Sequence, residues 1–95
     1  MPALYLVHCG FYDQEFGGIY ESHVSQFVVA ESFEDARMKA KLLDVFRSKS
    51  MHIDGMQLIS SVDGWNVNLV PDPAMSQKSL LISKTFRELA STSST

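Results

Sequence analysis

The chain has 95 residues and a mass of 10.6 kDa, with 45% hydrophobic residues, 20% charged residues and a formal net charge of −3. This length suits a single domain, and the hydrophobic fraction is too high for a disordered chain. An isoelectric point of about 5.4 argues against a general nucleic-acid-binding protein, which carries a basic surface. The single cysteine, Cys9, excludes an internal disulfide and a zinc site made of several cysteines.

The apolar runs and the N-terminal segment predict a cytoplasmic protein. Residues 1–9 contain no Lys or Arg and no small-residue cleavage site, so we expect no secretory signal. The apolar stretches are far shorter than the roughly 20 residues that span a bilayer. One unpaired thiol agrees with a reducing compartment. We therefore expect no membrane segment.

Two strands are predicted before the first helix. Residues 3–9 form an apolar run rich in strand-forming residues, and both of its alternating faces are largely apolar, as in a strand covered on both sides. Gly10 is expected to open a loop that reaches about Ser22, because glycine permits a positive φ and interrupts the strand pattern. Residues 23–30 are the second predicted strand.

The clearest predicted element is a helix from Phe33 to about Arg47. Ser32 is its expected N-cap, and the acidic residues Glu34 and Asp35 suit the positive end of a helix. The expected apolar stripe has helical spacing and consists of Met38, Leu42, Val45 and Phe46, widened by Ala36 and Leu43. We predict that this helix lies on a sheet.

Two more strands are predicted after the helix, over residues 52–62 and 65–70. Asp63-Gly64 between them is the pair typical of a tight hairpin turn. The turn predicts three cross-strand pairs on one face: Val62 with Trp65, Ser60 with Val67, and Leu58 with Leu69.

The last part of the chain is predicted as a C-terminal helix over residues 76–90, regular from about Ser79, followed by a disordered tail over 91–95. The residues Ser-Leu-Leu-Ile-Ser at its start fit a strand equally well. The expected fold class is therefore α+β. It has a ββαββ core over residues 1–75, a mainly antiparallel sheet with one long helix on one face, and this C-terminal helix.

Charge falls in blocks along the chain. Residues 1–36 contain six acidic residues and no Lys or Arg, whereas residues 37–49 contain five basic residues and one acidic residue. One interpretation is a solvated helix beside an acidic loop. The other is that the two regions meet, within the chain or across subunits, where complementary charge sets orientation.

Several short segments together form a recognisable pattern over roughly residues 4–70. They are Leu4-Tyr5-Leu6-Val7 before Gly10, Phe27-Val28-Val29-Ala30-Glu31-Ser32 after His23, Glu34-Asp35-Ala36-Arg37 before Lys39-Ala40-Lys41, His52-Ile53-Asp54, and Val62-Asp63-Gly64. This pattern resembles the bacterial domain of unknown function 1543 family. The resemblance implies a cytoplasmic α+β domain with one or two copies per chain, here a single copy. It implies no activity, cofactor or catalytic residue.

We expect a homodimer on two grounds. The family resemblance implies that a single-copy chain pairs with itself to rebuild the two-copy arrangement of its relatives. In addition, one firm helix covers only one sheet face, although the first strand is apolar on both. Either the C-terminal helix or a partner covers the second face. No nucleic-acid or membrane partner is expected, and a small-molecule ligand is left open.

The candidate ligand-binding residues are His23, His52, Asp54 and Tyr12. His52 and Asp54 are two residues apart in a predicted strand and so point to the same side, as do Glu21 and His23. A carboxylate can orient an imidazole for base catalysis or metal ligation. A mononuclear metal site from His23, His52 and Asp54 requires their two strands to be neighbours. The simpler interpretation is a hydrogen-bonded histidine at a sheet edge, because His-x-Asp is a motif of low specificity.

Four other residues have side chains or amines that could bind a ligand or react. Tyr12 belongs to an aromatic loop that could clasp a ligand or a partner, or fold over the sheet. His8 and Cys9 are expected to be buried, the latter as a small hydrophobe without a nearby cation to activate it. If Met1 is removed, the Pro2 amine could act as a base, as it does in tautomerases. In those enzymes a long helix directly follows the first strand, and this sequence predicts no such helix.

The interpretation we favour is a non-enzymatic, homo-oligomeric binding or interaction module. The alternative is an enzyme or metal-dependent protein with a site near His23, His52 and Asp54. No catalytic residue, metal or cofactor is assigned from the sequence.

Overall fold

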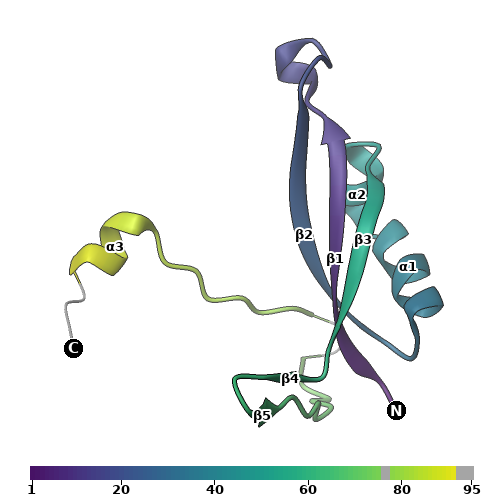
Figure 1. The fold of residues 1–95 in the computed structure, drawn as a ribbon, viewed down its shortest axis with the longest axis vertical. Helices are drawn as coiled ribbons and strands as arrows, with labels where there is room; N and C mark the ends of the chain where they lie inside the picture. The colour runs from purple at the N-terminus through teal and green to yellow at the C-terminus, as the bar shows by residue number, and fades with distance from the viewer. Residues whose placement is uncertain (76–77, 92–95) are drawn as a thin grey trace.

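The sheet is built around β1 (Ala3–Tyr12), which lies between β2 (Glu21–Ala30) and β3 (His52–Ile59) and runs antiparallel to both (Figure 1). The computed structural model describes residues 1–75 and 78–91. β1 and β2 form a long hairpin, and the chain enters β3 after a helical segment that packs on one face of the sheet. The predicted α+β class and antiparallel sheet are confirmed.

β1 continues past Gly10, where a loop was expected. Gly10 lies opposite His23, and the pairing continues to Tyr12 opposite Glu21. Because a glycine between two paired strands keeps its backbone hydrogen bonds, it does not end the strand. The loop is confined to residues 13–20.

A short 3₁₀ helix, η1 (Gln14–Phe16), forms this loop. The Asp13 carboxylate accepts a hydrogen bond from the Glu15 N–H at 2.9 Å and so caps the turn. Gly17 and Gly18 both have a φ of 71°, in the left-handed region where glycine is favoured. The loop therefore closes without backbone strain.

Residues on alternate sides of β1 have different surroundings. Tyr5, Val7 and Cys9 face the helices and are buried. The residues between them face the opposite side, which we call the open face. By the register of the three strands, the open face consists of Leu4, Leu6, His8, Gly10, Tyr12, Glu21, His23, Ser25, Phe27, Val29, His52, Gly55, Gln57 and Ile59. Asp54, which has no partner in the register, also belongs to this face by its contacts with His23 and His52.

The helical segment is interrupted rather than continuous, forming α1 (Phe33–Lys41) and α2 (Asp44–Ser48). The predicted N-cap is confirmed, since Ser32 Oγ accepts a hydrogen bond from the Asp35 N–H at 3.1 Å. The interruption occurs at Leu43, whose φ of −66° and ψ of 139° are extended. A single helix to Arg47 was expected because the apolar spacing continues across this break.

The break also changes which helical residues are buried. Ala36 and Ala40 are fully buried on α1 and Phe46 is buried on α2, whereas Met38 and Leu42 are exposed. The predicted stripe is therefore wrong at Met38 and Leu42. Two alanines one helical turn apart let the α1 backbone lie close to the sheet, and the extended residue resets the helical phase before Phe46.

The core is small. It contains nine buried residues: Tyr5, Val7, Cys9, Val28, Ala30, Ala36, Ala40, Phe46 and Met51. Phe33 closes one end of it by packing edge-on against the Tyr5 ring, with 5.1 Å between the centroids. Only the helix-covered side of the sheet contributes to this core.

The predicted Asp63-Gly64 hairpin is present as β4 (Ser61–Val62) and β5 (Trp65–Asn66). Asp63 and Gly64 have φ angles of 52° and 84°, as the tight turn requires. This hairpin is a separate two-stranded sheet, so the strands predicted over 52–62 and 65–70 are both shorter than expected.

Two of the three cross-strand pairs predicted from the turn are present. Val62 pairs with Trp65, and the Val67 N–H donates a hydrogen bond to the Ser60 carbonyl at 2.9 Å. Leu58, expected opposite Leu69, instead lies opposite Tyr5 in the main sheet.

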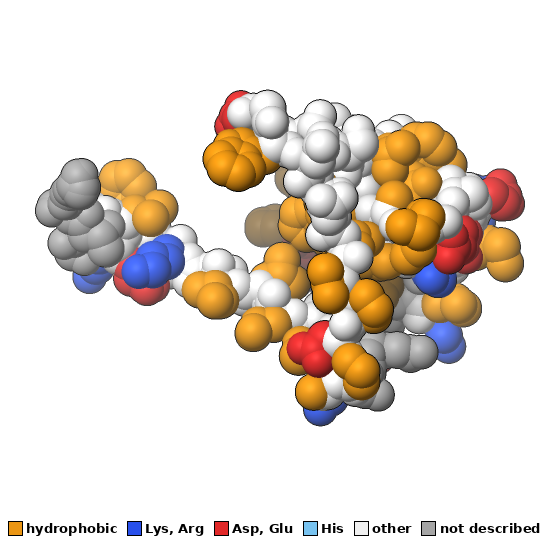
Figure 2. Space-filling model, turned by 90° about the horizontal axis from the view of Figure 1, so that it is seen from below, with side chains coloured by type: hydrophobic (Ala, Val, Ile, Leu, Met, Phe, Trp, Pro, Cys, Tyr) orange, Lys and Arg blue, Asp and Glu red, His pale blue; other side chains and the backbone are white. Residues whose placement is uncertain are grey.

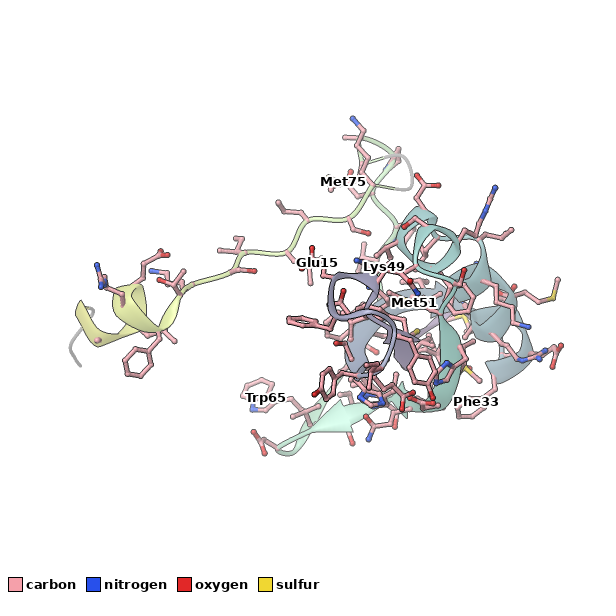
Figure 3. All side chains as sticks on the ribbon, turned by 90° about the horizontal axis from the view of Figure 1, so that it is seen from above. Glu15, Phe33, Lys49, Met51, Trp65 and Met75 are labelled. Carbon is pink, nitrogen blue, oxygen red and sulfur yellow. The ribbon has the colours of Figure 1, made fainter. Side chains whose placement is uncertain are left out.

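The acidic hairpin loop and the basic helical segment meet at one place within the chain. Glu15 and Lys49 line a hollow of about 200 Å³, and Figure 3 shows them on neighbouring elements. Lys49 Nζ also lies 5.0 Å from the centre of the Phe11 ring. The opposite charge blocks of the sequence are thus in part brought together in one chain.

Residues 78–91 form a C-terminal arm that runs away from the sheet and ends in α3 (Phe86–Ser91) (Figures 1 and 3). A C-terminal helix was predicted, but it begins at Phe86 rather than near Ser79, and residues 79–85 are neither helix nor strand. The tail predicted over 91–95 lies outside the described residues from position 92 onward.

The start of α3 has a local cause. The Glu88 N–H donates to Thr85 Oγ1 at 3.2 Å, and Glu88 Oε1 accepts from the Thr85 N–H at 3.3 Å. This reciprocal pair is a capping box, Thr-x-x-Glu, which fixes the first turn of a helix. No helix in the described ranges is long and apolar enough to cross a membrane.

Candidate functional site

One end of the open face carries four ionisable side chains from two strands that do not touch each other. We call Glu21, His23, His52 and Asp54 the histidine–carboxylate cluster. Glu21 and His23 come from β2, and His52 and Asp54 come from β3. β1 runs between these strands, and its residue at this level is Gly10, paired with His23 on one side and with His52 on the other.

The four side chains meet across β1. His52 Nε2 lies 2.8 Å from Glu21 Oε1 and 3.1 Å from Asp54 Oδ1. His23 Nε2 lies 3.3 Å from Asp54 Oδ2 and 3.7 Å from Glu21 Oε1. Each histidine therefore lies closer to the carboxylate of the other strand than to the carboxylate two residues away in its own strand.

Gly10 makes this meeting possible. A Cβ at this position would lie 2.7 Å from Glu21 Oε1, 2.7 Å from His52 Nε2 and 2.9 Å from Asp54 Oδ2. Any side chain here would occupy the space that the functional groups share. The sequence-based hypothesis required the strands of His23 and His52 to be neighbours. Their strands are not neighbours, because β1 lies between them. The side chains still meet, because Gly10 of β1 has no side chain to keep them apart.

Asp54 is directed into the cluster by a β-bulge. His8 pairs with Gly55 and Cys9 pairs with Ile53, so Asp54 is the extra residue on β3. A bulge re-aims a side chain relative to a regular strand, and here it lets both Asp54 oxygens face histidines. The cluster is partly open to solvent, with side-chain exposures between 33% for Glu21 and 61% for His23.

His8 lies next to the cluster on the same face but belongs to a separate hydrogen-bonded row. Its Nδ1 lies 2.9 Å from Ser25 Oγ and its Nε2 lies 3.1 Å from Gln57 Oε1. His8 was expected to be buried. It is instead half-buried, and both ring nitrogens have partners.

Cys9 points to the opposite side of β1 and is fully buried, as expected. Burial raises the pKa of its thiol, and the nearby Asp54 carboxylate raises it further. The thiol therefore stays protonated and is a weak nucleophile.

The four candidates from the sequence occupy different positions. His23, His52 and Asp54 lie in the cluster, whereas Tyr12 is about half exposed at the end of β1, opposite Glu21. Sequence reasoning noted the spacing of Glu21 but did not select it as a candidate. The signal that would have found it is long-range, namely a glycine at the same level as two histidines in the flanking strands.

The aromatic loop does not fold over the sheet. Phe16 and Tyr20 stack edge-to-face with 6.2 Å between ring centroids, and both rings are mostly exposed. The loop therefore extends the hairpin instead of covering the open face.

The other end of the open face is apolar. Its residues lie side by side in the register, with Leu4 between Val29 and Ile59, and Leu6 beside Phe27. We call Leu4, Leu6, Phe27, Val29 and Ile59 the apolar patch. Phe27 is 49% exposed and Val29 is 46% exposed. The open face thus changes from apolar to ionisable along one strand.

These elements define a small α+β domain, an antiparallel sheet with helices on one face and a histidine–carboxylate cluster on the other. The family model described as Domain of Unknown Function (DUF1543) matches residues 18–69, which is more than half of the chain, so the chain belongs to this family. The match contains β2, α1, α2 and β3, and so all four cluster residues. No curated protein and no solved structure gave a match.

Proposed function

We propose that this protein is a cytoplasmic, homodimeric interaction module that pairs through the apolar patch of its open face. The observation that supports the proposal is the patch itself, five hydrocarbon side chains that are contiguous in the sheet, of which Phe27 and Val29 are about half exposed and the other three are partly exposed. Such patches on small proteins mark interaction sites, because exposed apolar surface costs about 25 cal/mol per Å². The patch carries no polar group for chemistry, so its role is binding.

A second copy of the chain is the partner that the described residues favour. Each chain has an uncovered apolar patch and also an arm whose apolar side chains face solvent. Leu80, Leu81, Ile82 and Phe86 on the arm are between 62% and 88% exposed. Figure 2 shows hydrophobic side chains both along the arm and on the body of the molecule.

The arm carries exposed apolar side chains that could cover the apolar patch. In Figures 1 and 3 it runs away from the sheet of its own chain, so it is free to reach another molecule. Two chains that exchange arms would each cover the other's patch, and the contact would be the same in both directions. This is the self-complementary contact that a two-fold dimer requires.

The test compares two charged substitutions on opposite sides of the domain. Phe27→Asp changes the patch, and Met38→Asp changes an exposed apolar residue on the outer side of α1. Native mass spectrometry and light scattering of the full chain should give a dimer for the wild type and Met38→Asp, and a monomer for Phe27→Asp. Burial of one phenylalanine is worth about 1.5–3 kcal/mol, so dimer affinity should fall at least about tenfold.

A further substitution tests the arm. Ile82→Asp should weaken the dimer to a similar extent if the arm covers the patch, and should leave it unchanged if the two sheets meet face to face. Circular dichroism confirms that each variant is folded. A wild type that stays monomeric at high concentration would refute the proposal, as would a Phe27→Asp variant that dimerises like the wild type.

A further inference from the structure

We propose that the histidine–carboxylate cluster binds one divalent transition-metal ion of the zinc class, through Glu21, His23, His52 and Asp54. The proposal is independent of the proposed dimer, because the cluster lies at the opposite end of the open face from the apolar patch. The proposed dimer contact uses the apolar patch, and the metal ion is proposed for the histidine–carboxylate cluster, which takes no part in that contact.

The spacing of the donor atoms fits a metal ion. Glu21, His52 and Asp54 each offer one ligand atom, and these three atoms lie within 4.8 Å of one another. Bonds of about 2.0–2.1 Å place neighbouring donors roughly 2.9–3.4 Å apart in octahedral or tetrahedral sites. The distances of 2.8, 3.1 and 3.3 Å between imidazole nitrogens and carboxylate oxygens are close to this range. His23 lies beside this group of three, with its Nε2 3.3 Å from Asp54 Oδ2 and 3.7 Å from Glu21 Oε1, and we propose it as the fourth ligand.

The types of donor indicate which metals fit. Two imidazole nitrogens with two carboxylate oxygens form a mixed set that suits zinc and its neighbours in the first transition row. Magnesium and calcium prefer oxygen donors alone. Neutral imidazoles are the ligating form, so the two carboxylates would leave the cluster with a charge of −2, which one divalent ion neutralises.

Among the described residues, no lysine or arginine forms an ion pair with the two carboxylates. The ion pairs of Glu21 and Asp54 within residues 1–75 and 78–91 are with His23 and His52. A hydrogen-bonded network alone also leaves a mismatch, since His52 Nε2 has a single site for a proton but faces two carboxylate oxygens at 2.8 and 3.1 Å. A metal ion between the groups removes the mismatch.

The backbone holds the donors before any ion binds. They lie on two strands fixed to β1, and strands position ligands more rigidly than loops do. Gly10 leaves the space between them, and the bulge aims Asp54 into it. The crowded glycine is specific to this level of the sheet, because a Cβ at Gly55, the other glycine of the sheet, would have nothing within 4 Å.

The experiment measures zinc binding to the metal-free full chain by calorimetry, and Co²⁺ binding by its visible absorption. The ligand variants are His52→Gln and Asp54→Asn. The matched control is His8→Gln, which removes a histidine of the same open face that is held by Ser25 and Gln57. We expect one ion per chain, with cobalt bands that show nitrogen and oxygen ligation.

Loss of a supporting partner at a metal site costs roughly 10–100-fold in affinity, and loss of a ligand costs at least as much. His52→Gln and Asp54→Asn should therefore weaken binding at least about tenfold, and His8→Gln should leave it unchanged. The monomeric Phe27→Asp variant should still bind zinc, which separates this proposal from the dimer. Binding that is equal in the wild type and in the two ligand variants, or is weakened as much by His8→Gln, would overturn the site.

Discussion

The two faces of β1 are both apolar over the first half of the strand and differ in surroundings. Tyr5, Val7 and Cys9 lie under the helices and form part of the core, whereas Leu4 and Leu6, between them along the strand, lie on the open face. Hydrophobic residues on both sides are typical of a strand that is covered on both sides, and the proposed dimer would cover the second one. Among the described residues, the helices cover one of these faces, and the open face is the one that the proposed dimer would use.

The covered face is selected by the helix rather than by the strand. Ala36 and Ala40 present a flat surface that fits closely over Val7 and its neighbours, and α1 therefore packs there. On the open face, Phe27 and the ionisable groups above Gly10 project from the sheet. A helix laid along the whole of that face would bury the ionisable groups, which is costly unless their charge is paired.

Adjacent residues of β1 give the largest expected contrast. Val7→Asp places a charge in the fully buried core, which costs more than about 4 kcal/mol and so approaches the whole stability of a small domain. Leu6→Asp places the same charge one residue away, on the open face. We expect the first variant to lose its cooperative thermal transition and the second to stay folded but monomeric.

Circular dichroism melting with light scattering distinguishes the two outcomes. If Leu6→Asp unfolds as readily as Val7→Asp, the open face is part of the folding core and the division between the faces does not hold. If Leu6→Asp is folded and dimeric, the apolar patch is not the interface.

The two glycines of the sheet give the next contrast. Gly10→Ala would insert a methyl group within 2.7 Å of Glu21 Oε1 and His52 Nε2, so the cluster must open. Overpacking of this kind costs about 1–3 kcal/mol. Gly55→Ala meets nothing within 4 Å and should be neutral or slightly stabilising.

Urea unfolding measures the free energies, and the ring signals of His23 and His52 in NMR spectra report the geometry of the cluster. Both signals should move in Gly10→Ala and remain in place in Gly55→Ala. Equal stabilities and unmoved ring signals in the two variants would mean that Gly10 does not shape the cluster.

Local signals in the sequence predicted much of the fold. Ser32 caps its helix, Asp63-Gly64 makes its turn, and the central apolar run is the middle strand. Each of these signals lies within a short stretch of the chain, so it can be recognised without knowing which distant residues come together. The candidate site was predicted only in part. The pairs Glu21–His23 and His52–Asp54 are local, but their meeting across Gly10 is not.

The features that the sequence did not predict depend on distant residues or on competing local signals. Met38 and Leu42 were expected in the core because the apolar period was extended through Leu43, where the helix breaks. The start of α3 was placed too early, since the capping box at Thr85 and Glu88 outweighs the apolar residues before it. The cluster required the register of three strands, which no local pattern supplies.

The smallest expected effect lies on the covered side, where α1 begins. The Asp35 carboxylate accepts a hydrogen bond from the Glu31 N–H at 3.0 Å and lies 3.4 Å from Lys39 Nζ. The hydrogen bond from Glu31, with a further contribution from Lys39, holds the pKa of Asp35 below its usual range. The unfolded chain therefore binds this proton more readily than the folded one. The stability that Asp35 contributes is complete above its unfolded pKa and is lost as the pH falls through its folded pKa.

Asp35→Asn should lower the melting temperature slightly at neutral pH and make it less dependent on pH below about 4. Glu34→Gln, in the same helical turn, is the charge-matched control and should retain the acid dependence of the wild type. Thermal melts from pH 2 to 7 compare the three proteins. An acid dependence that is unchanged in Asp35→Asn would show that the first turn of α1 is held by Ser32 alone, and that the covered face owes its helix to the cap and the alanines without help from charge.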